Sequence, residues 1–147
     1  MRMRIGSAVA GWLMSVACLV PATGHAERQL VQMPPMMQQH MLGNMRNHLV
    51  TLNEIISLVA AGHYDRAGAL AEAQLGMSSL PLHGAAHMAP YMPQPMQAIG
   101  TSMHKAASRF ARAAQDAAVE RNLPQLLHRL SDVTVQCTAC HAAYRIR

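Results

Sequence analysis

The sequence predicts an all-α protein that folds as a four-helix bundle. Apolar residues recur every three or four positions in four segments, none of which shows the alternation of a half-buried strand, and glycines or prolines stand at the segment boundaries. Of the 147 residues, 51% are hydrophobic and only 13% are charged. This composition favours a folded core over a disordered chain, and the length fits one domain.

Residues 1–26 are predicted to be a cleaved secretory signal peptide. Arg2 and Arg4 give a basic start, an apolar run follows over 5–20, and small residues precede a cut after Ala26. A membrane anchor fits less well, because Pro21 breaks the run and polar chain follows. We therefore expect residues 27–147 to be a single exported domain that resides in the periplasm without inserting into the membrane.

The charge of the mature chain does not suggest a nucleic-acid partner. Removing Arg2 and Arg4 lowers the formal net charge from +5 to +3. No dense basic stripe remains, and aromatic residues that could stack on bases make up only 3% of the chain.

The first helix is predicted over 36–61. Pro34 and Pro35 can open it, and Gly62 stands where a C-terminal cap belongs. Its expected buried face consists of Leu42, Met45, Leu49, Leu52, Ile56 and Val59.

A shorter second helix is predicted over 65–75. Asp65 is its expected N-terminal cap, Gly68 weakens it, and Gly76 stops it. An irregular connection with five prolines or glycines is then expected over 77–95.

The third helix is predicted over 95–121, and a fourth follows Asn122 and Pro124. The third has a regular apolar face formed by Met96, Ile99, Met103, Ala106, Phe110, Ala113 and Ala117. Its expected basic face, which could dock an acidic redox partner, comprises His104, Lys105, Arg109 and Arg112.

The fourth helix carries Cys137-Thr138-Ala139-Cys140-His141, which matches C-x-x-C-H, the attachment sequence of c-type haem. Cys137, Cys140 and His141 stand at i, i+3 and i+4 and project from one side of a helix, which we expect to be the buried side. Two thioether bonds can hold the porphyrin while the imidazole binds the iron. Zinc fits less well because a second cysteine pair is missing, and a thioredoxin-like pair would need a strand beside the helix.

The motif continues through Ala142-Ala143-Tyr144-Arg145 to give C-x-x-C-H-x-x-Y-R. In this pattern and in the order of its predicted helices, the chain resembles the class II c-type cytochromes, which comprise the cytochrome c prime family and its low-spin relatives. The resemblance implies an antiparallel four-helix bundle in which one haem c is bound by the last helix, with His141 as the proximal ligand. The connection over 77–96 departs from the family, because it is longer.

The same resemblance implies that Arg145 lies near the proximal imidazole or a haem propionate. The alternative is a solvated arginine that the helix dipole favours in the last turn.

Two functions are distinguished by the sixth ligand of the iron. Low-spin relatives place a methionine of the first helix on the iron and carry electrons, whereas five-coordinate members bind small gases such as NO and CO. Met41 stands five residues before the Arg46-Asn47 pair, as the ligand does in the low-spin branch, and is the expected distal ligand. Met45 is the second choice, and His40 would give bis-histidine ligation.

The sequence therefore predicts a periplasmic electron carrier and not an enzyme, since paired carboxylates and an activated nucleophile are not evident. Periplasmic redox proteins are its expected partners, small gases are the ligands in the alternative, and the resemblance suggests a homodimer. A second alternative is a copper-binding protein that leaves the C-x-x-C-H motif empty. Its ligands would come from Met77, His83, His87, Met88, Met92 and Met96.

Overall fold

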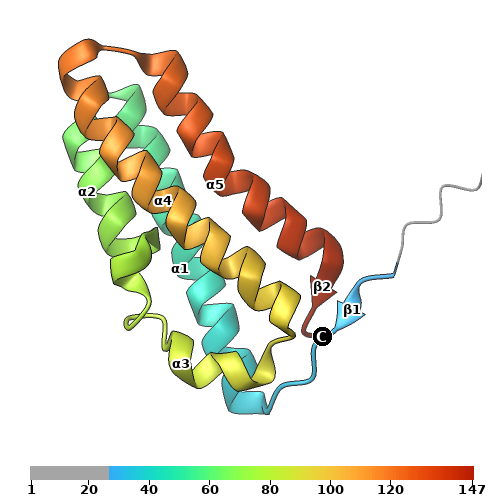
Figure 1. Ribbon diagram of the computed structural model, residues 1–147. Coiled ribbons are helices and arrows are strands. Elements are labelled where there is room, and N and C mark those ends of the chain that lie inside the picture. The colour runs from blue at the N-terminus through green and yellow to red at the C-terminus, as the bar shows by residue number, and fades with distance from the viewer. Residues whose placement is uncertain (1–26) are drawn as a thin grey trace, which may run out of the picture.

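The computed structural model describes residues 27–147, which are mostly helical and contain two short strands (Figure 1). The all-α prediction is confirmed. The predicted signal peptide lies outside the described residues. The long helices are α1 (Pro35–Ala60), α2 (Tyr64–Leu75), α4 (Gln94–Glu120) and α5 (Leu123–Ala143). The short elements are β1 (Gln29–Leu30), η1 (Met77–Ser79), α3 (Ala85–Met88), η2 (Ala89–Tyr91) and β2 (Tyr144–Arg145).

Helix α4 is the centre of the arrangement, because it packs against both α2 and α5, and α2 in turn packs against α1. The tight turns from α1 to α2 and from α4 to α5 lie at one end of the molecule (Figure 1). The start of α1, the end of α5, α3 and both strands lie at the other end (Figure 1). Among residues 27–147, no helix is long and apolar enough to cross a membrane.

Helix α1 has the predicted bounds to within one residue. Pro35 occupies its first turn, and Gly62 follows its end with a φ of +75°. The buried face differs from the predicted one, because α1 packs against α2 and leaves one flank open. Leu49 and Ile56 are therefore exposed, and the buried residues are Met41, Thr51, Ile55 and Val59.

Helix α2 begins at Tyr64, so Asp65 lies in the first turn and is not the N-terminal cap. The residue before the helix is His63, whose side chain makes no capping hydrogen bond. Gly68 is buried in the interface with α4. The glycine that weakens the helix in isolation thus permits the close approach of two helices.

The sequence predicted an irregular connection between α2 and α4, but part of this connection is helical. It contains η1, α3 and η2, and Pro90 lies in the first turn of η2, where a proline costs no hydrogen bond.

Helix α5 has a side-chain N-terminal cap, since the side-chain oxygen of Asn122 accepts a hydrogen bond from the Gln125 amide at 3.2 Å.

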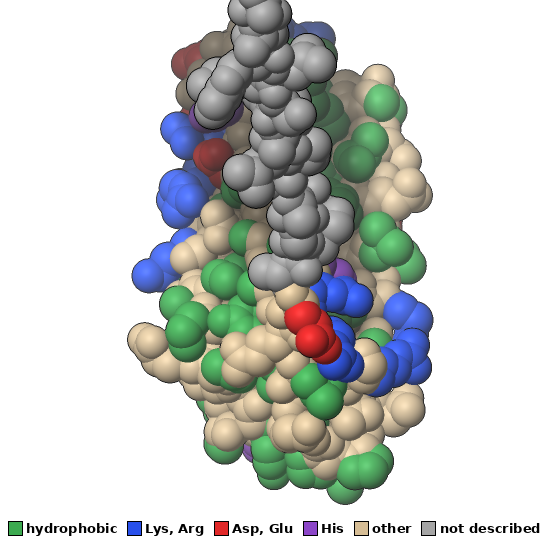
Figure 2. All heavy atoms as spheres, turned by 90° about the vertical axis from the view of Figure 1, so that its right-hand side faces the viewer, with side chains coloured by type: hydrophobic (Ala, Val, Ile, Leu, Met, Phe, Trp, Pro, Cys, Tyr) green, Lys and Arg blue, Asp and Glu red, His purple; other side chains and the backbone are tan. Residues whose placement is uncertain are grey.

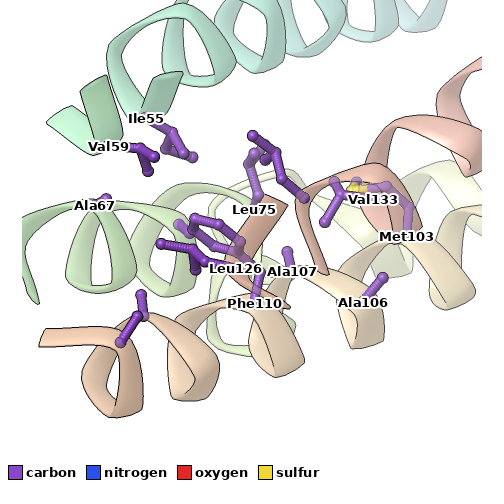
Figure 3. Close-up of a cluster of buried hydrophobic side chains, with 14 residues drawn as sticks. Ile55, Val59, Ala67, Leu75, Met103, Ala106, Ala107, Phe110, Leu126 and Val133 are labelled. Carbon is purple, nitrogen blue, oxygen red and sulfur yellow. The ribbon is translucent and has the colours of Figure 1, made fainter. Parts of the chain in front are cut away.

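The main core lies between the four long helices, and its buried residues include a single aromatic ring, that of Phe110 (Figure 3). Ile55 comes from α1, Leu75 from α2 and Leu126 from α5, and all three are almost fully buried. Figure 3 shows these side chains pointing inward from their helices toward a common interior. Six of the ten remaining buried residues are alanines of α2 and α4, which let the helices approach closely.

The two strands, which the sequence pattern did not predict, tie the ends of the described chain together. They pair in parallel, with Gln29 opposite Tyr144 and Leu30 opposite Arg145. The Val31 amide extends the ladder by donating to the Arg145 carbonyl oxygen at 2.8 Å. Each strand has only two residues, too few for any alternating pattern to be visible in the sequence.

Candidate functional site

The C-x-x-C-H motif lies in the last two turns of α5, as predicted. Cys137 and His141 are exposed, Cys140 is half-buried, and both thiols are free. Burial raises the pKa of both thiols. Although Cys137 as a residue is exposed, its Sγ lies back against the helix, 3.7 Å from the Val133 carbonyl oxygen. Both sulfurs are therefore neutral thiols at neutral pH.

The prediction that both cysteines lie on the buried face of the last helix is wrong for Cys137 and partly correct for Cys140. The buried stripe of α5 consists of Leu126, Leu130 and Val133 and ends there. Beyond Val133, α5 extends past the main core toward the end of the molecule where α1 begins (Figure 1). The motif is exposed because no main-core residues pack against this part of α5.

A second hydrophobic cluster connects Cys140 to the start of α1. We call it the methionine cluster; its buried members are Val31, Met33, Met41, Met88 and Met96. Cys140 and Tyr144 pack against it, as do the half-buried Met37, Met45, Met92 and Ile146. Met41 is only 8% exposed. The predicted distal ligand and one attachment cysteine thus belong to the same cluster.

The other predicted distal candidates differ in their surroundings. Met45 is half-buried at the edge of the methionine cluster. His40 is exposed and donates from Nε2 to the His83 carbonyl oxygen at 2.9 Å. Of the three, Met41 has the deepest position.

Arg145 lies in β2 and not in the last helical turn, because α5 ends at Ala143. Its guanidinium forms an ion pair with the Glu27 carboxylate at 3.2 Å. The Glu27 side chain is 86% exposed, so this pair contributes at most about 1 kcal/mol. The prediction of a solvated arginine in a helix is therefore incorrect.

Only three of the six predicted copper ligands come together. Met88 and Met96 are buried in the methionine cluster, and Met92 packs against it. His83 is buried elsewhere, beside Ser79, while Met77 and His87 are exposed. The connection divides these side chains among separate surroundings because α3 and η2 fix their directions.

His104 does not belong to the basic face of α4. It is 8% exposed, and its Nδ1–H donates to the Leu75 carbonyl oxygen at 2.8 Å. Its neighbours are His48 and His83, and the sequence pattern did not predict that these three residues meet. A signal was present in α1, where Met41, Met45 and His48 stand at i, i+4 and i+7 and so share one face.

The surface beside α5 is mixed in character. Figure 2 shows hydrophobic side chains reaching the surface on this side, with Lys and Arg side chains both at its edges and near its centre. Leu127 and Val135 of α5 are exposed. An apolar hollow of about 670 Å³ lies between the end of α1 and the start of α5, lined by Ile56, Leu123 and Leu127 among others. It lies at the opposite end of α5 from the motif.

Comparison of the chain with protein-family models, with curated proteins and with solved structures gives no match. Any functional assignment therefore rests on the motif and its surroundings.

Proposed function

We propose that this protein is a periplasmic c-type cytochrome that transfers electrons through one covalently bound haem c. In this proposal Cys137 and Cys140 form the two thioether bonds, His141 is the proximal ligand of the iron, and Met41 is the distal ligand. The single observation that carries the proposal is the C-x-x-C-H motif on an exposed helical end, with both cysteines as free thiols.

The donor set suits a haem. Neighbouring positions on α5 supply two thiols that can be alkylated and an exposed imidazole that has no hydrogen-bond partner among residues 27–147. Met41 supplies a thioether from a neighbouring helix, in the cluster against which Cys140 packs. Haem provides a one-electron couple when bound, and the axial ligands set its potential.

A porphyrin between Met41 and His141 would replace contacts that Cys140, Tyr144 and Ile146 make with the methionine cluster. The flexible methionines of that cluster are well suited to repack against a flat apolar group. We therefore propose that the long helices form an antiparallel four-helix bundle whose haem lies between the start of α1 and the end of α5.

The residues of this chain then have separate tasks. His141 and Met41 would hold the iron in a low-spin state, with the thioether favouring the reduced form. The methionine cluster would exclude water from the distal side, and the exposed end of α5 would leave one haem edge close to the surface for a redox partner.

Absorption spectra of the matured protein test this function. We expect a low-spin spectrum in the oxidised and reduced states that does not change when carbon monoxide is added. A high-spin spectrum that responds to carbon monoxide would instead support a five-coordinate gas-binding protein.

A further inference from the structure

Three histidines from distant parts of the sequence lie together in the structure. His48 comes from α1, His83 from the segment between η1 and α3, and His104 from α4. Their ring centroids are 4.6, 5.4 and 6.1 Å apart. His83 and His104 are each only 8% exposed, and His48 is half-buried. We call this group the histidine cluster.

Hydrogen bonds determine which nitrogen of His83 carries the proton. The Ser79 hydroxyl donates to the Gly76 carbonyl oxygen at 2.7 Å, so its oxygen is free to accept from His83 Nδ1, which lies 3.4 Å away. The protonated nitrogen of His83 is then Nδ1. A neutral imidazole has only one N–H group, so Nε2 of His83 presents a lone pair.

His104 is held in the same tautomer. Its Nδ1 lies 2.8 Å from the Leu75 carbonyl oxygen, which can only accept, so Nδ1 is protonated and Nε2 has the lone pair. Histidines that bind metal ions typically donate their second ring nitrogen to a backbone carbonyl or a similar acceptor in this way. Further support comes from Asn44 and His40, which both donate to the His83 carbonyl oxygen and fix the backbone at that residue.

The distance between His48 and His83 matches that of two ligands on one ion. Their Nε2 atoms are 3.3 Å apart. Two imidazole nitrogens that each lie about 2.0–2.1 Å from a tetrahedral Zn²⁺ are about 3.3–3.4 Å apart, and their ring centroids are about 5 Å apart. Without an ion, one N–H···N hydrogen bond bridges the same gap.

The pKa values of His48 and His83 agree with this geometry, because a metal ion binds the neutral form of an imidazole. Burial, followed by the proximity of His83 and His104, lowers the pKa of His48 from 6.5 to about 4. The pKa of His83 is likewise lowered, first by burial and then by His104 and His40. At these two histidines protons therefore compete little with a metal ion at neutral pH.

Within residues 27–147, no three ligating side chains are already arranged around a common point. His48 and His83 meet the ligand spacing, and the His104 ring must turn toward them about its hydrogen bond to Leu75. The geometry points to a binding site for one divalent transition-metal ion, of the class that prefers imidazole ligands, formed by His48, His83 and His104. Only His83 is shared with the copper-ligand set considered from the sequence, and the site does not depend on haem.

Zinc titration tests this inference. Bound metal is first removed from the exported, mature protein with a chelator, and Zn²⁺ is then added. We expect one Zn²⁺ per chain by calorimetry. His48→Gln and His104→Gln should each weaken the affinity at least about tenfold, because each removes one ligand. His48→Gln is the primary variant, since His48 is half-buried and holds no backbone group in place. The matched controls, His87→Ala and His128→Ala, remove exposed histidines and should bind Zn²⁺ as the original protein does.

X-ray absorption of the zinc-loaded protein gives an independent measurement that does not require any variant to fold. We expect a first shell of nitrogen or oxygen atoms with the scattering pattern of imidazole. A sulfur ligand, the absence of binding, or equal affinity in the His48→Gln variant and in the controls would overturn the proposal.

Discussion

Gly68 of α2 lies directly against the backbone of Ala111 in α4. A Cβ atom at position 68 would be 2.8 Å from the Ala111 carbonyl oxygen and 2.9 Å from the Ala114 Cβ. Neither neighbour is the flexible end of a side chain, so a larger residue must push the two helices apart. The α2–α4 interface therefore depends on the absence of a side chain at this position.

Gly68→Ala should consequently destabilise the protein, although alanine is the better helix former. We expect a loss of about 1–3 kcal/mol of unfolding free energy in urea denaturation. Gly100→Ala is the control, because Gly100 lies in α4 and a Cβ atom there would meet no neighbouring atom within 4 Å. It should leave the stability unchanged or raise it by up to about 1 kcal/mol. Equal effects at the two positions would contradict the close approach.

Phe110 should dominate the energetics of the main core. It is fully buried and is the only aromatic side chain of that core's buried residues. Phe110→Ala should cost about 3–5 kcal/mol of unfolding free energy, because the cavity left behind cannot close between alanine-lined helices. Val119→Ala, at a position of α4 that is 84% exposed, should change the stability by less than about 0.5 kcal/mol. A loss below about 1 kcal/mol for Phe110→Ala would refute this assignment of the core.

The histidine cluster should make the stability fall in mildly acidic solution. Because the pKa of His48 is lowered to about 4 in the folded chain, the unfolded chain binds a proton first as the pH falls. The stabilisation is complete above about pH 6.5 and is lost between about pH 6.5 and 4, by on the order of 2–3 kcal/mol. Urea denaturation with a chelator present at pH 7 and at pH 4.5 measures this loss. His48→Gln should lose less than the original protein does, and an identical pH profile would contradict the prediction.

Met41 should control the spin state of the iron. Met41→Ala should convert a low-spin, carbon monoxide-insensitive spectrum into a high-spin spectrum that responds to carbon monoxide, because the distal position becomes vacant. Met36→Ala provides the control, since Met36 is 74% exposed on the same helix and its replacement should leave the spectrum unchanged. An unchanged low-spin spectrum in Met41→Ala would shift the distal role to Met45 or His40.

The sequence predicts the long helices well because their signals are local. Pro34 and Pro35 at the start of α1 and Gly62 after it mark its ends, and the apolar spacing in α4 and α5 identifies most of the core residues on those two helices. The predictions fail where contacts between residues far apart in the sequence determine the position of a side chain. Periodicity alone does not show that Gly68 faces the Ala111 backbone, nor that His104 turns inward to the Leu75 carbonyl oxygen.

The candidate site likewise has features that the sequence predicts and features that it does not predict. The C-x-x-C-H motif and its position in the last helix can be read directly from the sequence. The exposure of Cys137 depends on where the helices stop covering one another, and the ion pair of Arg145 with Glu27 depends on a parallel strand pair that joins the two ends of residues 27–147. Local pattern carries no information on such contacts.

The most direct test of the central claim is whether the exported protein carries covalent haem. The full chain is produced together with a c-type haem maturation system, and the mass of the intact, denatured protein is measured. We predict the mass of residues 27–147 plus one haem, and no covalent haem when both Cys137 and Cys140 are replaced by alanine. An exported, folded protein with both thiols free or joined in a disulfide, and without haem, would contradict the account.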